Sequence, residues 1–329
     1  MVAYVAPARG LTPVLDLGPW LDGSDRPGVA RAFDRIAREI GFFYLVGHGV
    51  PPARMQDILH QAERFFAQDM AAKRAVLLSP QRRGYEPLAL QALDITSPPD
   101  VKEGFLIGES PGAAPGHATS TAGVHDADEN RWPAPDTLPG FQASCQAYFS
   151  AAKHVATTLM DVFAAAAGLP AGHFAPMWHR SMSSLRLLHY PPQPVMAEAN
   201  QLGCGAHTDW GAVTVLLQDG TGGLEVQAAD GEWLYAHPMP GAFIVNLGDM
   251  MPVWTDGAYH SNPHRVRNRS PDRHRYSVPF FLDPEHAAPV ACLDAFRRPG
   301  EAPRFAPRTA GAHLDLMYAM TYGAGQAVA

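Results

Sequence analysis

The chain of 329 residues lacks the features that mark three classes of protein. Its three cysteines are widely spaced, which excludes a disulfide framework and is typical of free thiols in a reducing compartment. It has no block of Lys and Arg and a formal net charge of −7, which argues against a nucleic-acid partner. The apolar stretch 155–169 contains Asp161 and is too short to cross a bilayer, and the opening residues lack the apolar core of a signal peptide. We therefore expect a cytoplasmic protein without a membrane partner.

The composition indicates a folded chain with many turns. Hydrophobic residues make up 47% of the sequence, so the 31 prolines and 30 glycines predict frequent turns and not disorder. The length suits one large domain or two, with a sizeable buried core in either case. We expect a monomer.

A histidine and an aspartate two positions apart, His207 and Asp209, form the most informative motif. Residues i and i+2 of a strand share a face and lie roughly 6.6 Å apart, so both reach one metal if the strand bends or ends there. His264 follows Asp209 by 55 positions and must return from another part of a sheet. Two imidazoles and one carboxylate are the ligands of the facial triad that holds non-haem Fe(II) in oxygenases and leaves positions open for co-substrate and O2.

Alternative assignments near this motif are less consistent with the spacing. A closed zinc site needs four ligands, usually with cysteine among them, and no cysteine is placed to help. His260 lies four positions before His264, which is roughly 13 Å in an extended segment and too far to share the metal. Trp210 follows Asp209 directly, so alternation along a strand predicts that its side chain faces away from the metal.

Arg275 and Ser277 follow the same period of two, eleven positions beyond His264. A planar guanidinium binds a carboxylate through two parallel hydrogen bonds, and the serine hydroxyl adds a third. A short dicarboxylate would chelate iron at one end and meet Arg275 at the other. 2-Oxoglutarate has this shape. The alternative to co-substrate binding is that Arg275 forms a structural ion pair within the protein.

These motifs, taken in order, resemble a known family over nearly the whole chain. The sequence is similar to the isopenicillin N synthase-like group of Fe(II)/2-oxoglutarate-dependent oxygenases. The resemblance rests on the metal triad and on segments 36–50, Gly84-Tyr85, Asp100-Val101-Lys102-Glu103, Asn130-Arg131-Trp132-Pro133, His189-Tyr190-Pro191-Pro192, Asn246-Leu247-Gly248-Asp249, Trp254-Thr255-Asp256-Gly257 and His264-Arg265-Val266.

The resemblance implies a reaction and a further co-substrate residue. It implies that Fe(II), 2-oxoglutarate and O2 act together, so that decarboxylation to succinate and CO2 accompanies hydroxylation, desaturation or ring closure of a small organic molecule. It places Tyr190 beside the co-substrate carboxylate, although Tyr190 could instead simply pack in a strand. Many plant members carry asparagine two residues before this tyrosine, and Leu188 stands there in this chain, so fewer co-substrate contacts are expected on that side.

Helical signals precede strand signals along the chain. Apolar residues at helical spacing predict helices from Val29 to Ile40, capped by Ser24 or Asp25, around residues 55–66, and from after Pro139 to about Ala167. Strands are predicted at 14–17, 42–46, 185–190, 212–218, 224–227, 233–237, 243–247, 264–267 and 276–282, with a hairpin turn at Asp230-Gly231.

This order favours an α+β fold. The resemblance implies a double-stranded β-helix, or jelly-roll, core with N-terminal and flanking helices. We divide the chain into an N-terminal region (1–135), a long backing helix and its connection (136–183), the Fe(II)/2-oxoglutarate-binding core (184–285) and a C-terminal extension (286–329).

The residues that contact the organic substrate are harder to assign. Arg275, Ser277, Pro279 and Phe281 alternate along one predicted strand and should face the barrel interior. The family also has an aromatic residue beside its substrate at the position of Phe281, although an aromatic fills a core equally well. Phe105 and segment 108–128, a possible lid, are the alternative pocket residues.

Two other functions fit parts of the pattern. A keto-acid-independent oxidase of the isopenicillin N synthase type would keep the triad and use Arg275 and Ser277 on its substrate. A non-catalytic ligand sensor would keep the fold without needing the triad, and the intact ligand set argues against it. The sequence does not identify the substrate.

Overall fold

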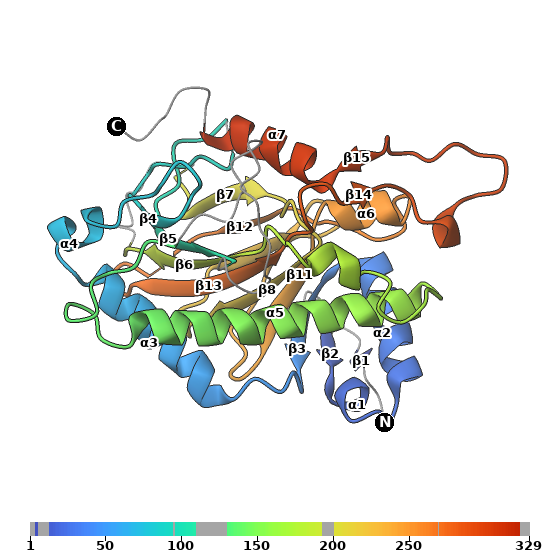
Figure 1. Ribbon diagram of the computed structural model, residues 1–329, viewed down its shortest axis with the longest axis horizontal. Helices are drawn as coiled ribbons and strands as arrows, with labels where there is room; N and C mark the ends of the chain where they lie inside the picture. Colours follow the sequence, from blue (N-terminus) through green and yellow to red (C-terminus); the bar gives the residue numbers. More distant parts are fainter. Residues whose placement is uncertain are drawn as a thin grey trace.

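Two facing sheets form the centre of the protein (Figure 1). The computed structural model describes residues 4–5, 13–94, 96–109, 130–192, 201–268 and 270–322. The larger sheet contains nine strands, in the order β1 (Tyr4–Val5), β2 (Val14–Asp16), β3 (Phe42–Val46), β11 (Phe243–Leu247), β8 (Val213–Gln218), β13 (Arg275–Leu282), β6 (Ser184–Tyr190), β5 (Glu103–Gly108) and β4 (Gly84–Glu86). The smaller sheet contains β10 (Trp233–Tyr235), β9 (Leu224–Gln227), β12 (His264–Val266) and β7 (Cys204–His207). β14 (Pro289–Val290) and β15 (Arg308–Thr309) form a separate pair.

Alternation along the strands divides the interior into two apolar clusters. In β3, Phe43 and Leu45 belong to the cluster shared with the helices, whereas Phe42 and Tyr44 belong to a second cluster with residues of both sheets. Neighbouring side chains on a strand point to opposite faces, so one face of the large sheet packs on helices and the other faces the small sheet. This is the predicted jelly-roll core, and the functional side chains lie between its two sheets.

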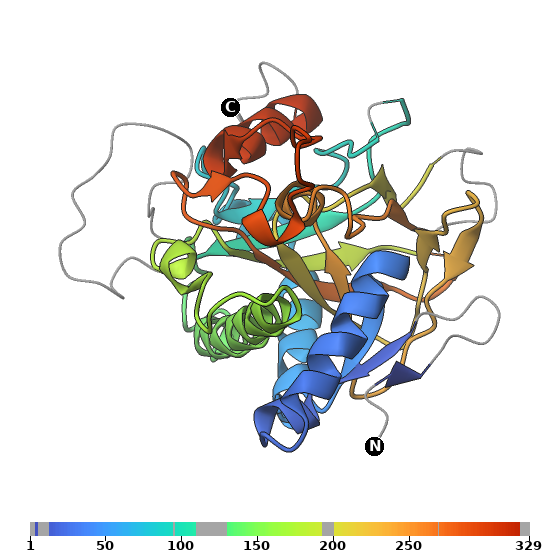
Figure 2. The same cartoon turned by 90° about the vertical axis from the view of Figure 1, so that its right-hand side faces the viewer.

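Helices pack on both sides of the sheets (Figure 2). They are α1 (Gly18–Leu21), α2 (Arg26–Glu39), α3 (Pro52–Phe66), α4 (Met70–Arg74), α5 (Phe141–Ala166), α6 (Met250–Trp254) and α7 (Ala310–Tyr322), with 3-10 turns at Ala175–Trp178 and Asp294–Phe296. Figure 2 shows α2, α3 and α5 together on one side of the sheets and α7 on the other. Within the described residues, no helix combines the length and apolar character that crossing a bilayer requires.

Local sequence signals account for several element boundaries. The Asp25 carboxylate accepts a hydrogen bond from Gly28 N at 2.8 Å, and Pro27 lies in the first turn of α2, so Asp25 is the cap and not Ser24. Gly231 has a φ of 89°, which a side chain disfavours, in the hairpin between β9 and β10. Both features confirm the predictions made for these turns.

The predicted strands agree with the structure apart from their ends, but shorter elements were missed. The predictions did not include β4, β5 and β7, nor the helices α4, α6 and α7. The omission of α7 matters most, because residues 286–329 were treated only as an extension. The possible lid at 108–128 falls, from residue 110 onward, outside the described residues.

Candidate metal and co-substrate site

The structure brings His207, Asp209 and His264 together. One ligand atom from each of the three side chains lies within 4.8 Å of the others. Both histidine Nε2 atoms are 3.7 Å from Asp209 Oδ1. His207 ends β7 and pairs directly with His264 of β12, while Asp209 lies just beyond β7. The antiparallel pairing of β7 with β12 therefore places His264 beside His207, although 57 positions separate the two in the sequence.

Hydrogen bonds fix which atom of each side chain faces the centre. His207 Nδ1 contacts the Gly205 carbonyl oxygen at 2.8 Å, and His264 Nδ1 contacts that of Asn262 at 3.2 Å. A ring that donates through Nδ1 carries its free lone pair on Nε2, the nitrogen that faces the other ligands. Asp209 Oδ2 accepts hydrogen bonds from Thr214 Oγ1 of β8 at 2.5 Å and from Asn246 Nδ2 of β11 at 2.7 Å, so Oδ1 is left for a metal.

The protonation states also suit a cation. Burial and the neighbouring His207 lower the pKa of His264 to about 4, so its ring is neutral. Burial alone would raise the pKa of Asp209, but the two histidines and the hydrogen bonds from Asn246 and Thr214 bring that pKa below its usual value. Neutral imidazole and ionised carboxylate are the forms that bind metal. The donor set fits Fe(II), since two nitrogens and one oxygen occupy one side of the centre.

Arg275 lies on the opposite sheet and is fully buried. Its Nε donates to the Gly222 carbonyl oxygen at 2.5 Å, and its two terminal nitrogens donate to Ser277 Oγ at 3.2 Å and Gln218 Oε1 at 3.3 Å. The guanidinium has five N–H donors, so two are left. Among the described residues, no carboxylate forms an ion pair with Arg275. Because a buried charge without a partner is costly, an anionic ligand would satisfy this group.

Tyr190 lies against the same guanidinium. Its ring centroid is 4.6 Å from Arg275 Cζ, and Arg275 and Tyr190 are direct partners in the pairing of β13 with β6. Burial raises the pKa of Tyr190, so its phenol keeps its proton and can donate to a carboxylate. The structure thus places Arg275, Ser277 and Tyr190 together.

One cavity connects this group with the metal ligands. It spans about 550 Å³ of space between the sheets, part of it open to solvent. Its lining includes the three metal-site residues and, from the large sheet, Tyr190, Arg275, Ser277, Pro279 and Phe281. The prediction that alternate residues of this strand face the interior is confirmed. A molecule in this cavity can touch the metal ligands and Arg275 at the same time.

Two family models match most of the chain. Residues 181–284 match the 2OG-Fe(II) oxygenase superfamily, and residues 12–135 match the model described as non-haem dioxygenase in morphine synthesis N-terminal. The 2-oxoglutarate-Fe(II) type oxidoreductase hxnY of Emericella nidulans is 36% identical, over 96% of this chain and 91% of that protein. The chain belongs to the 2OG-Fe(II) oxygenase superfamily.

Other members of the superfamily support the enzyme class. A homoarginine-6-hydroxylase of Oryza sativa subsp. japonica is 32% identical, over 92% of this chain and 94% of that protein. A full-length Neurospora crassa protein solved with alpha-KG and thymine has a TM-score of 0.83 and 27% identity, covering 96% of this chain and 99% of that one. This oxygenase is therefore a non-haem Fe(II)/2-oxoglutarate-dependent dioxygenase, with Fe(II), 2-oxoglutarate and O2 as its cofactor and co-substrates.

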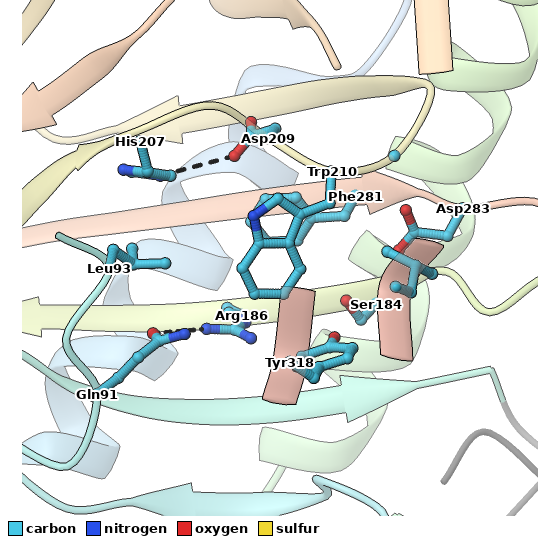
Figure 3. A pocket seen from close by; sticks show the side chains of 12 residues that line it. Gln91, Leu93, Ser184, Arg186, His207, Asp209, Trp210, Phe281, Asp283 and Tyr318 are labelled. Atoms are coloured by element: carbon cyan, nitrogen blue, oxygen red, sulfur yellow. Dashed lines mark hydrogen bonds and ion pairs between the residues drawn. The ribbon is translucent and has the colours of Figure 1, made fainter. Parts of the chain in front are cut away.

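A second cavity of the oxygenase adjoins the first (Figure 3). It spans about 440 Å³ of space, part of it open to solvent, and shares Leu93, Arg186, His207, Asp209 and Phe281 with the first cavity. Its remaining lining is Gln91, Ser184, Trp210, Gly211, Asp283, Leu314 and Tyr318. This second cavity borders His207 and Asp209 but not Arg275.

Trp210 lines this second cavity beside the metal ligands, which corrects the expectation that it faces away. β7 ends at His207, so alternation along a strand no longer governs the direction of residue 210. The Trp210 ring meets Tyr318 of α7 edge to face, with centroids 4.9 Å apart. The C-terminal helix α7 therefore forms a wall of the second cavity.

Phe281 and Phe105, the two aromatic residues considered for substrate contact, differ in their surroundings. Phe281 lines both cavities, in agreement with its predicted position on the strand. Phe105 does not line either one. Its ring packs in the core with centroids 4.6 Å from Phe65 and 5.2 Å from Phe141, and it is fully buried. The suggestion that Phe105 borders the substrate is corrected, because β5 presents it to the helices.

Sequence reasoning missed several polar residues of the oxygenase cavities. Lys102 lines the first cavity and forms an ion pair with Asp100. Its Nζ lies 3.7 Å from Cys204 Sγ. Asp100 Oδ1 accepts a hydrogen bond from Gly205 N at 2.8 Å, which ties this pair to the strand that carries His207. The segment 100–103 had been noticed only as part of the family pattern. Arg186 and Asp283 had no sequence signal, because each is a single polar residue in an apolar strand or at its end.

Proposed function

We propose that this oxygenase holds Fe(II) with His207, Asp209 and His264 and binds the distal carboxylate of 2-oxoglutarate with Arg275, Ser277 and Tyr190. The observation that carries the proposal is one cavity that contains both the three-ligand cluster and a buried guanidinium, which forms no ion pair with a carboxylate in the part of the chain that the structure describes. A short dicarboxylate is the ligand that satisfies both ends. The organic substrate would occupy the adjoining cavity bordered by Phe281 and Trp210.

The protein's own contribution is binding, orientation and exclusion of water. When bound, Fe(II) with 2-oxoglutarate and O2 supplies the oxidation, in which the keto acid becomes succinate and CO2 and one oxygen atom is inserted into a C–H bond. Thr214 and Asn246 orient the Asp209 carboxylate, and two backbone carbonyls orient the histidines. The apolar walls between the sheets keep water from the reacting atoms.

The substrate is proposed to be a small organic molecule, with hydroxylation as the default outcome. The names of two similar proteins support this, because one is a homoarginine-6-hydroxylase and the other was solved with thymine. Desaturation and ring closure use the same centre and are alternatives. A keto-acid-independent oxidase is less well supported, since the relatives are named for 2-oxoglutarate.

A screen for coupled succinate formation tests the proposal. The purified protein, loaded with Fe(II) and supplied with 2-oxoglutarate and O2, should form succinate faster when a metabolite pool contains its substrate. The Asp209→Ala variant gives the background rate of succinate formation. Oxygen uptake that depends on an organic compound but yields no succinate would instead identify the keto-acid-independent oxidase.

Replacing the two aromatic residues separates substrate contact from packing. Phe281→Ala should lower kcat/KM for the organic substrate by about tenfold or more, because a wall of the cavity is removed. Phe105→Ala should instead destabilise the protein by about 3–5 kcal/mol, the usual cost of deleting a buried ring. Turnover and thermal unfolding are measured for both variants. If Phe281→Ala lowers the melting temperature as much as Phe105→Ala and leaves kcat/KM unchanged, Phe281 is a packing residue.

A further inference from the structure

Asp283 places a buried carboxyl group in the wall of the substrate cavity. The residue follows β13 directly, and its side chain is 5% exposed. Its backbone is held by Ser183, whose Oγ accepts a hydrogen bond from Asp283 N at 3.2 Å and donates one to Asp283 O at 3.4 Å. A Cβ atom on Gly211 would collide with the carboxyl group, so the chain after the metal ligand Asp209 passes directly against it. The position of this carboxyl group is therefore well defined.

Among the described residues, no hydrogen bond reaches the Asp283 carboxyl oxygens. The residue lines the substrate cavity, so a molecule in the cavity can donate to this carboxyl group. Burial raises the pKa of Asp283 to about 7, with a further contribution from Asp209 that Arg186 partly offsets. A donor brought by a ligand would remove the cost of burying this group.

Arg186 places a hydrogen-bond donor in the same cavity. Its guanidinium donates to Gln91 Oε1 at 3.4 Å and forms an ion pair with Glu86 Oε2 at 3.9 Å. The residue is 8% exposed and lines the same cavity, where it can donate to a ligand. In the view of Figure 3, Trp210 lies between Arg186 and Asp283. A strong donor and a strong acceptor thus line one cavity at separate places.

Three aromatic side chains, Trp210, Phe281 and Tyr318, also line this cavity. Phe281 lies with its ring centroid 5.8 Å from Arg186 Cζ, and Trp210 and Tyr318 meet edge to face. Flat apolar walls with two polar contacts select a compact ligand by its shape and by where its donor and acceptor groups lie.

We propose that Asp283 and Arg186 determine substrate specificity, and that the substrate is a small nitrogen compound with an N–H donor for Asp283 and a carboxylate or carbonyl oxygen for Arg186. Amino acids and nitrogen heterocycles that carry a carbonyl or carboxyl group have this chemistry. The inference rests on the proposed function, because it places this compound beside the metal ligands. It also goes further, since it names the groups that the cavity recognises.

Pairs of compounds that differ only in the donor test the proposal. Amino acids and carbonyl- or carboxyl-bearing nitrogen heterocycles are each compared with a derivative whose nitrogen is fully methylated. Wild-type enzyme, measured by substrate-dependent succinate formation, should prefer the N–H member of an accepted pair by at least about tenfold. Asp283→Leu, which removes the acceptor while keeping a side chain of similar size, should reduce this ratio to near one. An unchanged ratio in Asp283→Leu overturns the proposal.

Matched variants exclude general effects of mutation. Glu285→Gln removes a carboxylate two residues further on, outside the cavity lining, and should keep the wild-type preference. Arg186→Gln should weaken binding of carboxylate compounds more than that of their neutral amides. If Asp283→Leu fails to fold, the wild-type protein alone still tests the proposal. An equal rise of its melting temperature with both members of each pair contradicts the proposal.

The design separates failure of this inference from failure of the proposed function. If the wild-type protein converts 2-oxoglutarate to succinate but accepts only compounds without a donor nitrogen, the specificity assignment is wrong and the oxygenase activity stands. If no succinate forms with any compound or in its absence, the proposed function itself fails.

Discussion

Alanine at any one of His207, Asp209 or His264 is expected to abolish turnover and sharply weaken Fe(II) binding. The cluster has only three protein ligand atoms, and each carries a large share of the coordination. Losing a residue that merely supports a ligand typically costs about 10- to 100-fold, so losing a ligand should cost more. Iron content after anaerobic loading and succinate formation are measured for each variant.

His260→Ala is the matched control for this set. His260 is exposed and lies four residues before His264 without joining the cluster. This variant should keep stoichiometric iron and full activity. Circular dichroism should show that all the variants are folded, since Asp209→Ala also leaves the hydrogen-bonding groups of Asn246 and Thr214 without their partner. Stoichiometric iron and full turnover in all three ligand variants would contradict the assignment.

The Arg275→Ala variant is expected to raise the apparent KM for 2-oxoglutarate far more than it disturbs iron affinity. A hydrogen bond to a charged group contributes about 1.5–3 kcal/mol, so losing it raises KM by roughly 10- to 100-fold. Arg275→Lys should recover part of the loss, because it restores the charge but not the planar fork. Succinate formation at varied 2-oxoglutarate concentrations gives the KM of each variant.

Arg273→Ala removes an exposed arginine two residues earlier and is the matched control, for which an unchanged KM is expected. An unchanged KM for 2-oxoglutarate in Arg275→Ala, together with weaker binding of the organic substrate, would favour the oxidase interpretation. In that case Arg275 would serve the substrate and not a keto acid.

The features that could be predicted from sequence depend on short-range periodicity. Arg275, Ser277, Pro279 and Phe281 share a face because a strand alternates with a period of two, whatever the sheet around it. The same rule fails at Trp210, because the strand ends at His207. Local spacing thus predicts which residues lie together only while the element continues.

Features that depend on long-range packing could not be predicted from sequence. The direct pairing of His207 with His264 requires the register of β7 on β12, which no local pattern encodes. Phe105 lies in β5, where every residue is buried, so burial does not reveal which face meets the cavity. Tyr318 reaches the cavity only because α7 folds back against it, and Arg186 and Asp283 acquire their significance only there.

Calorimetry of 2-oxoglutarate binding without O2 tests the central claim most directly, namely that the metal ligands and Arg275 hold the two ends of one molecule. Titrations are run on the wild-type protein, Asp209→Ala, Arg275→Ala and the double variant, each with and without Fe(II). Fe(II) should strongly increase the affinity of wild-type protein for 2-oxoglutarate, and the increase should disappear in Asp209→Ala. Each single substitution should reduce the binding free energy of 2-oxoglutarate. The two reductions should not be additive in the double variant, as expected for groups that share a ligand. Equal affinity with and without Fe(II) in the wild-type protein would contradict this account.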